Sequence, residues 1–353
     1  MQSGNLIMTS RSRLRLFSLL AVLVATPLLL AARPRLAVLT DIGGDPDDQQ
    51  SMIRLLVYAN ELDLELLMAT AVRTNHTPEG PSTRPQLIHQ LIDAYHEVLP
   101  NLRRHADGWP AADALRGVVV SGNPRYGRDF IGDGHDTPGS QALIDRIDAG
   151  SAEQPLNVSV WGGQTDLAQA LWRVKRDRGA SGFAVFVRKL RVFDVDDQDV
   201  LAGWMRTEFP GLHYILTRTH RDENGKRTRE GTYRGMYVGG DLSLTSRAWV
   251  DANILSRGPL GVLYPTKTWT VPNPHRCLKE GDTLAWFFFL PRGGNDPADP
   301  TKPGWGGRYR RTPDGWYEDV LIEDGTDPIQ TVNRWRPEFQ RNFAQRMVWC
   351  LPR

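Results

Sequence analysis

Four aspartates within eight residues are the strongest chemical feature of the sequence. They are Asp41, Asp45, Asp47 and Asp48, in the segment DIGGDPDD. Four like charges in one loop repel one another strongly unless a cation or solvent screens them. Oxygen-only ligands favour a hard cation, calcium first and magnesium second. The segment therefore predicts a calcium site, and the alternative is a solvated acidic turn that caps a helix.

Other known chemical templates do not fit the chain. Counted from Asp41 as an EF-hand loop, position 6 is Pro46 where glycine is required, and position 12 is Met52 where glutamate is required. The sequence contains no GxSxG elbow, no HExxH pair and no Walker loop. The acidic segment is thus the main candidate for chemistry.

The elements around the acidic segment indicate an α/β fold. The apolar run 36–40 is typical of a buried parallel strand, and residues 50–60 carry apolar side chains at helical spacing. Further strands are predicted at 64–71, 158–161, 183–187 and 190–195, and further helices at 84–98, after Gly163 and at 335–349. Alternating strands and helices predict an open, mostly parallel sheet flanked by helices. Ligands bind at the carboxyl edge of such sheets, which is where the aspartates lie.

The chain is predicted to be organised as one domain after a leader. Residues 1–32 contain a basic segment, an apolar stretch of about 17 residues and two small residues, which is typical of a cleaved signal peptide. An uncleaved membrane anchor is the alternative. Residues 33–353 then form a single domain whose C-terminal third is rich in loops, for example at 291–311, and 219–229 is predicted to be a solvated hairpin. We expect a periplasmic or secreted protein with no stable membrane span after cleavage.

Composition excludes several classes of protein. The chain has 43 basic and 41 acidic residues in 353, which argues against a general nucleic-acid binder. Two cysteines, Cys277 and Cys350, exclude a disulfide scaffold, and they could be paired or unpaired. Tryptophan is abundant, with 11 residues. Most are expected in the core, but exposed tryptophans could stack on sugar rings.

The acidic segment resembles the signature of the nucleoside hydrolase superfamily. More specifically, the chain resembles bacterial secreted cellulose-binding proteins with a nucleoside-hydrolase-like domain. The matching segments are TDIGGDPDDQQSMIRLLVYANE, VLPNLRRHADGWPAAD, VSVWGGQTDLAQAL, DDQDVLAGW, EGDT, WGGRY and NRWRPEFQRNFAQRMVWC, in this order over nearly the whole chain after the leader. Longer relatives carry a C-terminal immunoglobulin-like module, which we expect to be absent here.

The resemblance implies a set of site residues. Asp41 and Asp48 match calcium ligands, Thr165 matches a position whose backbone carbonyl binds calcium, and Asp282 is the candidate for a late aspartate that completes the site. Asp47 matches the general base that activates water, and Asp45 could join the ligands. The candidates for substrate binding are His76, Trp161, Asp197, Gln198, Asp199, Trp204 and Glu280, with Trp305 as a further stacking platform.

The sequence also departs from the superfamily pattern. The distance from Asp41 to the Asp47-Asp48 pair is two residues longer than usual, and Gly281 stands where some relatives have the histidine that protonates the leaving base. The expected function is therefore a calcium-dependent hydrolase of an N-glycosyl or furanosyl bond, acting on a carbohydrate or nucleoside-like molecule. The alternatives are a non-catalytic carbohydrate-binding protein and a degenerate structural protein. The protein could be a homo-oligomer.

Overall fold

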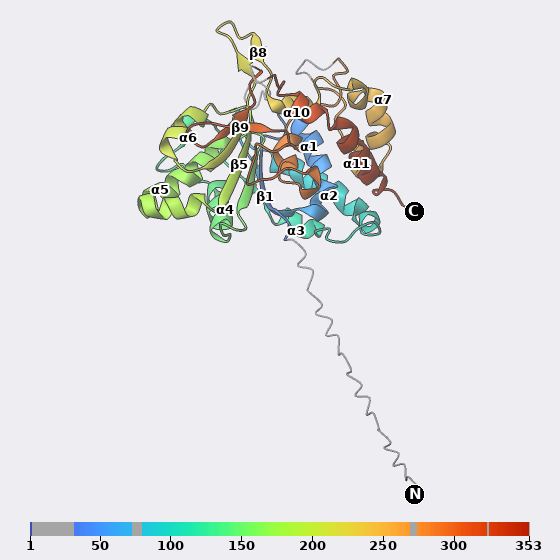
Figure 1. The fold of residues 1–353 in the computed structure, drawn as a ribbon, viewed down its shortest axis with the longest axis horizontal. Helices are drawn as coiled ribbons and strands as arrows, with labels where there is room; N and C mark the ends of the chain where they lie inside the picture. Colours follow the sequence, from blue (N-terminus) through green and yellow to red (C-terminus); the bar gives the residue numbers. More distant parts are fainter. Residues whose placement is uncertain (2–31, 73–79, 269–273, 323–324, 353) are drawn as a thin grey trace. The chain divides into compact units, whose positions relative to one another are not determined.

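A single large sheet carries the site residues in the computed structural model of the chain, which describes residues 1, 32–72, 80–268, 274–322 and 325–352 (Figure 1). Within these residues the strand order is β3-β2-β1-β4-β5-β6-β10-β9. Strands β1 to β6 and β10 run parallel, and β9 at the edge is antiparallel to β10. The bounds are β1 Arg35–Thr40, β2 Asp63–Ala69, β3 Val119–Ser121, β4 Leu156–Val160, β5 Leu190–Val195, β6 His213–Thr217, β9 Tyr309–Arg311 and β10 Tyr317–Asp319.

The central strands are buried on both faces, as their apolar sequences require. Along β1, Leu36 and Val38 pack into one hydrophobic cluster, whereas Ala37 and Leu39 pack into a second cluster on the opposite face. Successive side chains of a strand point to opposite faces, so one short run supplies both cores. Residues 33–353 form one unit around this sheet.

Helices cover both faces of the sheet (Figure 1). The face formed with α4, α5 and α6 lies opposite the face formed with α1, α2, α9 and α11. The α-helices are α1 Asp47–Leu56, α2 Pro85–Leu102, α3 Ala112–Arg116, α4 Pro138–Asp148, α5 Gln164–Val187, α6 Ala202–Glu208, α7 Arg247–Val250, α8 Gly258–Val262, α9 Thr283–Phe287, α10 Gln330–Asn333 and α11 Arg336–Val348. Short 3-10 turns include η1 Ala59–Glu61 and η4 Thr232–Met236, and a π-turn spans Asp251–Leu255.

The strand order places a topological switch between β1 and β4. The chain winds from β1 outward through β2 to β3, then returns to pair β4 on the other side of β1. Loops that leave the carboxyl ends of two such neighbouring strands diverge, and this opens a crevice where α/β proteins bind ligands. The acidic segment leaves β1 at this point, and Gly162 and Gly163 leave β4 there.

Most of the elements predicted from the sequence are present, and the predicted α/β fold with an open, mostly parallel sheet is confirmed. The exception is 183–187, predicted as a strand, which is the last part of α5. Phe183, Phe186 and Val187 are buried while Val185 is exposed, which is the spacing of one face of a helix. Because all of 183–187 is apolar, this helical spacing cannot be seen in the sequence. The predicted hairpin is confirmed as β7 (His220–Arg221) paired with β8 (Arg227–Arg229).

Two further expectations concern the ends of the chain and its thiols. The predicted signal peptide falls almost entirely on residues 2–31, which lie outside the described residues. Among the residues that the structure does describe, none of the helices combines the length and the apolar character needed to cross a membrane. Cys277 and Cys350 are both buried and unpaired, so of the two alternatives the free thiols are observed.

Candidate functional site

The first turn of α1 carries two aspartates into the crevice. Helix α1 begins at Asp47, directly after Pro46, and its N-cap has no side-chain hydrogen bond. Negative charge is favourable at a helix N-terminus, because the unpaired N–H groups carry partial positive charge. Asp47 and Asp48 therefore suit the start of the helix. They are nevertheless 6% and 3% exposed, and carboxylates are seldom buried this deeply unless a positive ion is paired with them.

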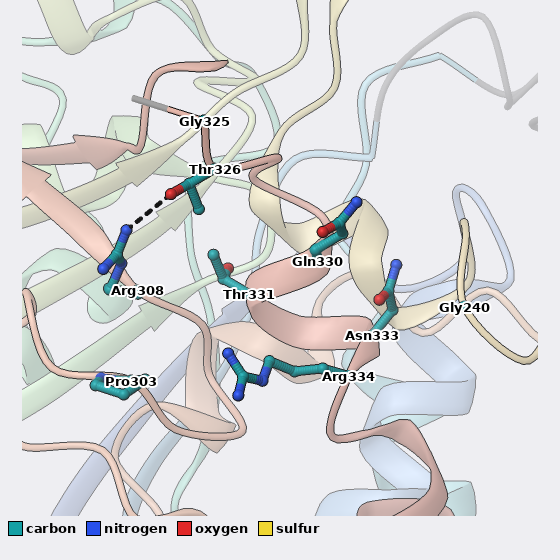
Figure 2. Close-up of a pocket in the computed structure, with 9 residues that line it drawn as sticks. All are labelled: Gly240, Pro303, Arg308, Gly325, Thr326, Gln330, Thr331, Asn333 and Arg334. Carbon is teal, nitrogen blue, oxygen red and sulfur yellow. Dashed lines mark hydrogen bonds between the residues drawn. The ribbon is translucent and has the colours of Figure 1, made fainter. Parts of the chain in front are cut away.

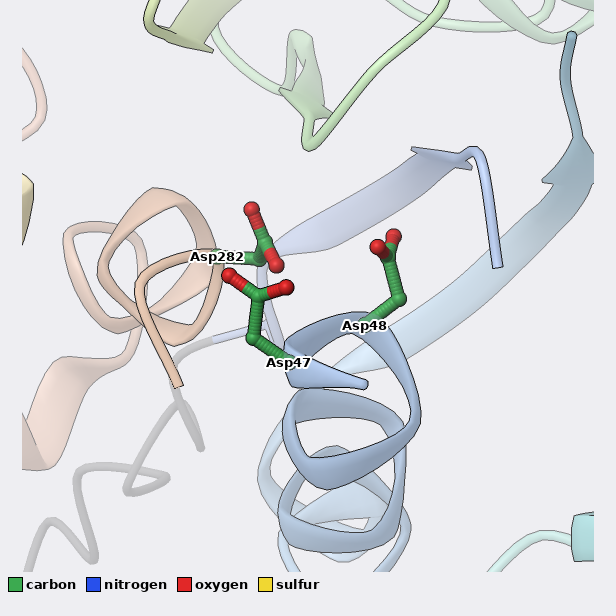
Figure 3. A group of neighbouring side chains, drawn as sticks. All are labelled: Asp47, Asp48 and Asp282. Carbon is green, nitrogen blue, oxygen red and sulfur yellow. The ribbon is translucent and has the colours of Figure 1, made fainter. Parts of the chain in front are cut away.

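Asp282 joins the pair from a distant part of the chain. It is the residue before α9, and one oxygen each of Asp47, Asp48 and Asp282 lie within 4.8 Å of one another. Figure 3 shows the carboxylate of Asp282 facing those of the two α1 residues. Asp282 is 3% exposed, and its Oδ2 is buried without a hydrogen-bond partner among the described residues. We call these three residues the carboxylate cluster.

The cluster is electrostatically strained. Burial raises the pKa of Asp48 well above its ordinary value, and the charges of Asp41 and Asp47 raise it further. Burial likewise raises the pKa of Asp282 well above its ordinary value, with added repulsion from Asp47 and Asp48. Burial disfavours a charged carboxylate, and nearby like charges add to this cost. The cluster would be relieved by a cation held among its oxygens.

A buried lysine partly offsets this charge. The Nζ of Lys279 lies 2.9 Å from Asp47 Oδ2 and also pairs with Asp45 Oδ2. Burial alone would lower the pKa of Lys279, but the negative charges of Asp47 and Asp45 outweigh it and raise this pKa well above its ordinary value. Lys279 was not predicted from the sequence, although it stands three residues before Asp282 in the same short segment.

Gln50 fixes the segment that carries Lys279 and Asp282 onto α1. Its Oε1 accepts from the backbone N–H groups of Lys279 at 2.9 Å and Glu280 at 3.2 Å. Its Nε2 donates to the carbonyl oxygens of Pro265 and Cys277, both at 2.8 Å. One buried amide thus satisfies four backbone groups of an irregular segment, which is why a distant loop can be held at the helix N-terminus.

One turn further along α1, a buried ion pair completes this attachment. Arg54 Nη2 lies 2.6 Å from Glu280 Oε2, and both side chains are fully buried. Tyr264 Oη donates to the other Glu280 oxygen at 2.6 Å. Glu280, predicted to bind substrate, is therefore closed off from the crevice, and this prediction is wrong. Its carboxylate instead fixes the backbone two residues before Asp282.

The loop after β5 forms the opposite wall. Asp196, Asp197 and Val200 have φ angles of 74°, 48° and 58°, so three residues other than glycine adopt left-handed backbone within five positions. Asp197 Oδ1 accepts from the N–H groups of Leu201 and Ala202 at 3.0 and 2.9 Å, which holds the loop in this shape. Strained backbone of this kind is concentrated at functional sites.

These elements enclose a cleft of about 550 Å³. Its described lining comprises the acidic loop, the cluster, the loop after β5 and three cations: Asp41, Asp45, Asp47, Asp48, Val195, Asp196, Asp197, Gln198, Val200, Arg218, Thr219, Arg221, Tyr233, Lys279 and Asp282. Arg218, Arg221 and Tyr233 were not anticipated, because nothing in their local sequence marks them. Arg218 lies just before the hairpin strand β7, and Arg221 is the last residue of that strand.

Glycine is required where β4 meets the cleft. A Cβ at Gly162 would lie 2.3 Å from Asp41 Oδ1, well inside the distance that real Cβ atoms show. The backbone of Gly162 therefore packs directly against the Asp41 carboxylate. This close approach brings the ends of β1 and β4 together beside the cluster.

The structure places seven of the predicted site residues on the cleft: Asp41, Asp45, Asp47, Asp48, Asp197, Gln198 and Asp282. Thr165 and Asp199 do not line it. Both the N–H and the hydroxyl of Thr165 donate to Asp199 Oδ2, at 2.8 and 2.7 Å, so these two residues bind each other at the start of α5. His76 lies outside the described residues.

The predicted tryptophan platforms are not available to a ligand. Trp161 is fully buried, with its Nε1 donating to Ser159 Oγ at 2.8 Å, and Trp305 is 2% exposed. Trp204 is half-buried on α6, where it packs edge-on against Phe209 at a centroid distance of 5.1 Å and does not line the cleft. The assignment of Trp161 and Trp305 to sugar stacking is therefore wrong, because packing in the core takes their ring faces, and Trp204, whose ring centroid lies 4.4 Å from Cζ of Arg128, lies off the cleft.

A second hollow of about 560 Å³ lies near α10 (Figure 2). Its described lining contains no carboxylate; it is Gly240, Pro303, Arg308, Gly325, Thr326, Gln330, Thr331, Asn333 and Arg334. Arg308 Nη2 donates to Thr326 Oγ1 at 3.1 Å across it. Without an acid or base to activate water, this hollow suits binding rather than hydrolysis, and the acidic cleft remains the candidate for chemistry.

The carboxylate cluster fits a hard divalent cation. Its donors are all oxygen, and the lone pairs of Asp282 Oδ2 have no protein partner among the described residues. The single charge of Lys279 does not balance the carboxylates that surround it. Calcium accepts six to eight oxygen ligands in a flexible arrangement and magnesium demands a regular octahedron, so an irregular cluster from two separate segments of the chain suits calcium better.

Comparisons with known proteins agree with this architecture. The family model described as "Cellulose-binding Sde182, nucleoside hydrolase-like domain" matches residues 35–309. A solved structure of a nucleoside hydrolase-related hypothetical protein from Saccharophagus degradans, associated with carbohydrate metabolism, aligns with a TM-score of 0.73 and 30% identity over 91% of this chain and 72% of that chain. No curated protein matches the sequence. The chain therefore belongs to the Sde182 family of nucleoside-hydrolase-like domains, as its sequence segments predicted.

Proposed function

We propose that this protein is a calcium-dependent hydrolase of glycosidic bonds, acting on an N-glycosyl or furanosyl substrate. The observation that carries the proposal is the buried carboxylate cluster of Asp47, Asp48 and Asp282 at the switch point of the sheet. The unpartnered Asp282 Oδ2 supports a bound ion independently of the acidic count. Membership of a nucleoside-hydrolase-like family supports the reaction class.

The residues of the cleft have separate roles in the proposed reaction. Asp48 and Asp282 would hold the cation, with Asp41 beside them, and calcium there would supply a lowered pKa for a water molecule and an anchor for sugar hydroxyls. Asp47 lies at the cleft wall and takes a proton from the attacking water. The water oxygen bonds to the anomeric carbon as the bond from that carbon to the leaving group breaks, and the leaving group departs with the bonding electron pair and takes a proton from solvent water. Asp197 and Gln198, on the opposite wall, contact the sugar.

The substrate is expected to be a carbohydrate outside the cytoplasm. The family description names cellulose binding, and the S. degradans relative is associated with carbohydrate metabolism. Together with the leader-like residues 1–32, this supports a periplasmic or secreted protein. Cell fractionation tests export, and N-terminal sequencing of the recovered chain tests cleavage; a chain found in the cytoplasm contradicts export, and a membrane-bound chain that still begins at Met1 contradicts cleavage.

A binding protein without turnover is the second candidate. Two observations favour it. The ammonium of Lys279 already pairs with Asp47, the proposed base, and the hollow near α10 has hydroxyl, amide and guanidinium groups that suit a sugar. In that case the cation would only stabilise the fold. The family description as cellulose-binding is consistent with both candidates.

The deciding experiment measures turnover and binding in parallel. The purified protein is incubated with nucleosides and with furanosyl glycans, in calcium or in chelator, and released sugar is quantified. Hydrolysis that requires calcium and is lost in Asp47→Asn supports the hydrolase. The matched control is Asp299→Asn, a change at an exposed aspartate that does not line the cleft. Binding to cellulose without release of sugar from any substrate establishes the second candidate instead.

A further inference from the structure

Lys279 is placed within the acidic cleft by its own backbone. Its N–H is held by Gln50, and its side chain is 11% exposed. The ammonium group contacts Asp47 Oδ2 at 2.9 Å and also Asp45 Oδ2. Lysine is rarely buried unless it is paired with an acidic group, and the two aspartates account for the burial of Lys279. The charged end of the Lys279 side chain therefore lies beside the carboxylate cluster and does not extend into solvent.

Within the described lining of the cleft, Lys279 is the cation that faces the cluster. The other two cations engage elsewhere: Arg218 pairs with Asp197 at 3.3 Å, and Arg221 donates to the carbonyl of Gly225 at 2.9 Å within the hairpin. Asp41, Asp45, Asp47, Asp48 and Asp282 line the same side. The ammonium of Lys279 thus lies beside the three carboxylates of the cluster.

We infer that Lys279 is a resident counter-ion whose charge opposes the binding of a divalent cation at the carboxylate cluster. Without a bound ion, the ammonium stabilises the acidic loop and lets the protein fold. With an ion bound, the ammonium lies near a second cation that draws on the same carboxylates, and the two repel each other. Lys279 therefore weakens divalent binding while it stabilises the metal-free state.

This inference rests on the cation site of the proposed function, and it predicts two effects of opposite sign. Removing the charge of Lys279 takes away the ammonium that offsets Asp47 and the rest of the carboxylate cluster, so the metal-free protein loses stability. The same change removes a repelling charge, so calcium binds more tightly. A lysine that served only to pack the segment would lower stability and would leave affinity unchanged or weaker.

The test uses Lys279→Met, which keeps most of the side-chain volume without the charge. Calcium chloride is titrated calorimetrically into the chelator-stripped protein, and the thermal midpoint is recorded in chelator. The variant is expected to bind calcium at least about tenfold more tightly, given the repulsion between close cations at an effective dielectric constant of about 20. Its midpoint in chelator falls, and calcium restores it.

The controls separate charge from folding. Lys302 also faces two aspartates, Asp296 and Asp299, but it is exposed and far from the cleft, so Lys302→Met should match the wild type in both measurements. If Lys279→Met does not fold, Lys279→Gln retains N–H donors for Asp45 and Asp47 without the charge, and the same changes are expected.

Each outcome decides between the two proposals. Tighter calcium binding in the variant supports the inference, and binding in the variant alone supports it while refuting calcium dependence of the natural protein. Equal or weaker binding in the variant, when the wild type binds, overturns the inference and leaves the proposed function standing. Absence of binding in both proteins overturns both.

Discussion

Replacing Asp282 by asparagine is expected to stabilise the metal-free protein and to abolish its response to calcium. The three oxygens of the cluster lie within 4.8 Å of one another. Two unit charges at that separation repel by about 3.5 kcal/mol at an effective dielectric constant of about 20. Asp282→Asn removes two of the three repelling pairs, and its amide gains N–H groups that can donate to Asp47 and Asp48.

The expected gain is smaller than the sum of two such pairs. Part of the repulsion is already relieved, because the raised pKa values of Asp48 and Asp282 favour protonation, and Lys279 attracts Asp282. We expect the free energy of unfolding in chelator to rise by about 2–3 kcal/mol, well below the two-pair Coulomb sum. In the wild type, calcium at about a thousandfold excess over its Kd should add about 4 kcal/mol, whereas the variant should gain little.

Urea denaturation followed by circular dichroism measures all four states: wild type and Asp282→Asn, each in chelator and in calcium. Asp299→Asn, at an exposed ion pair, serves as the control and should behave as the wild type. If Asp282→Asn is less stable than the wild type in chelator, the cluster is not repulsive as described. An equal gain from calcium in both proteins would show that the ion binds elsewhere.

Three further perturbations test the surroundings of the cleft. Arg54→Met leaves Glu280 as an unpaired buried charge and should lower the free energy of unfolding by about 3–5 kcal/mol in urea denaturation, whereas Arg116→Met at an exposed pair should not change it. Val200→Asn should raise the thermal midpoint by an amount equivalent to about 1 kcal/mol, because asparagine tolerates the left-handed backbone at φ 58° and valine does not; a lower midpoint contradicts the strain. Burial, with added repulsion from nearby arginines, lowers the pKa of His213 from 6.5 to about 4. As the pH falls, His213 therefore binds a proton in the unfolded chain before it does so in the folded chain. The folded state keeps its full stability above pH 6.5 and loses about 3 kcal/mol as the pH falls from 6.5 to 4. His213→Gln should flatten the profile of urea stability in that window, and an unchanged profile would assign the titration to other groups.

Hydrophobic patterning was sufficient to predict the core of the fold. Short apolar runs mark β1, β2, β4 and β5, because strands buried on both faces need apolar residues at nearly every position. The pattern failed at 183–187, where five residues are too few to separate a strand from one face of a helix. The antiparallel edge strand β9 and its neighbour β10 were also not predicted, since each is only three residues long.

The site divides in the same way. The sequence by itself determined that Asp41, Asp47 and Asp48 stand between the first strand and the first helix, because adjacent residues in a strand-loop-helix unit cannot lie far apart. The resemblance to a known family added Asp282. The tertiary structure decided that Lys279 meets Asp45 across 234 positions of sequence, that Gln50 and Arg54 hold the segment which brings it there, and that Trp161 and Trp305 face the core. Local spacing is set by backbone geometry, which the sequence carries directly. Contacts between distant irregular segments depend on which buried polar groups form hydrogen bonds with one another, and these groups follow no periodic pattern in the sequence.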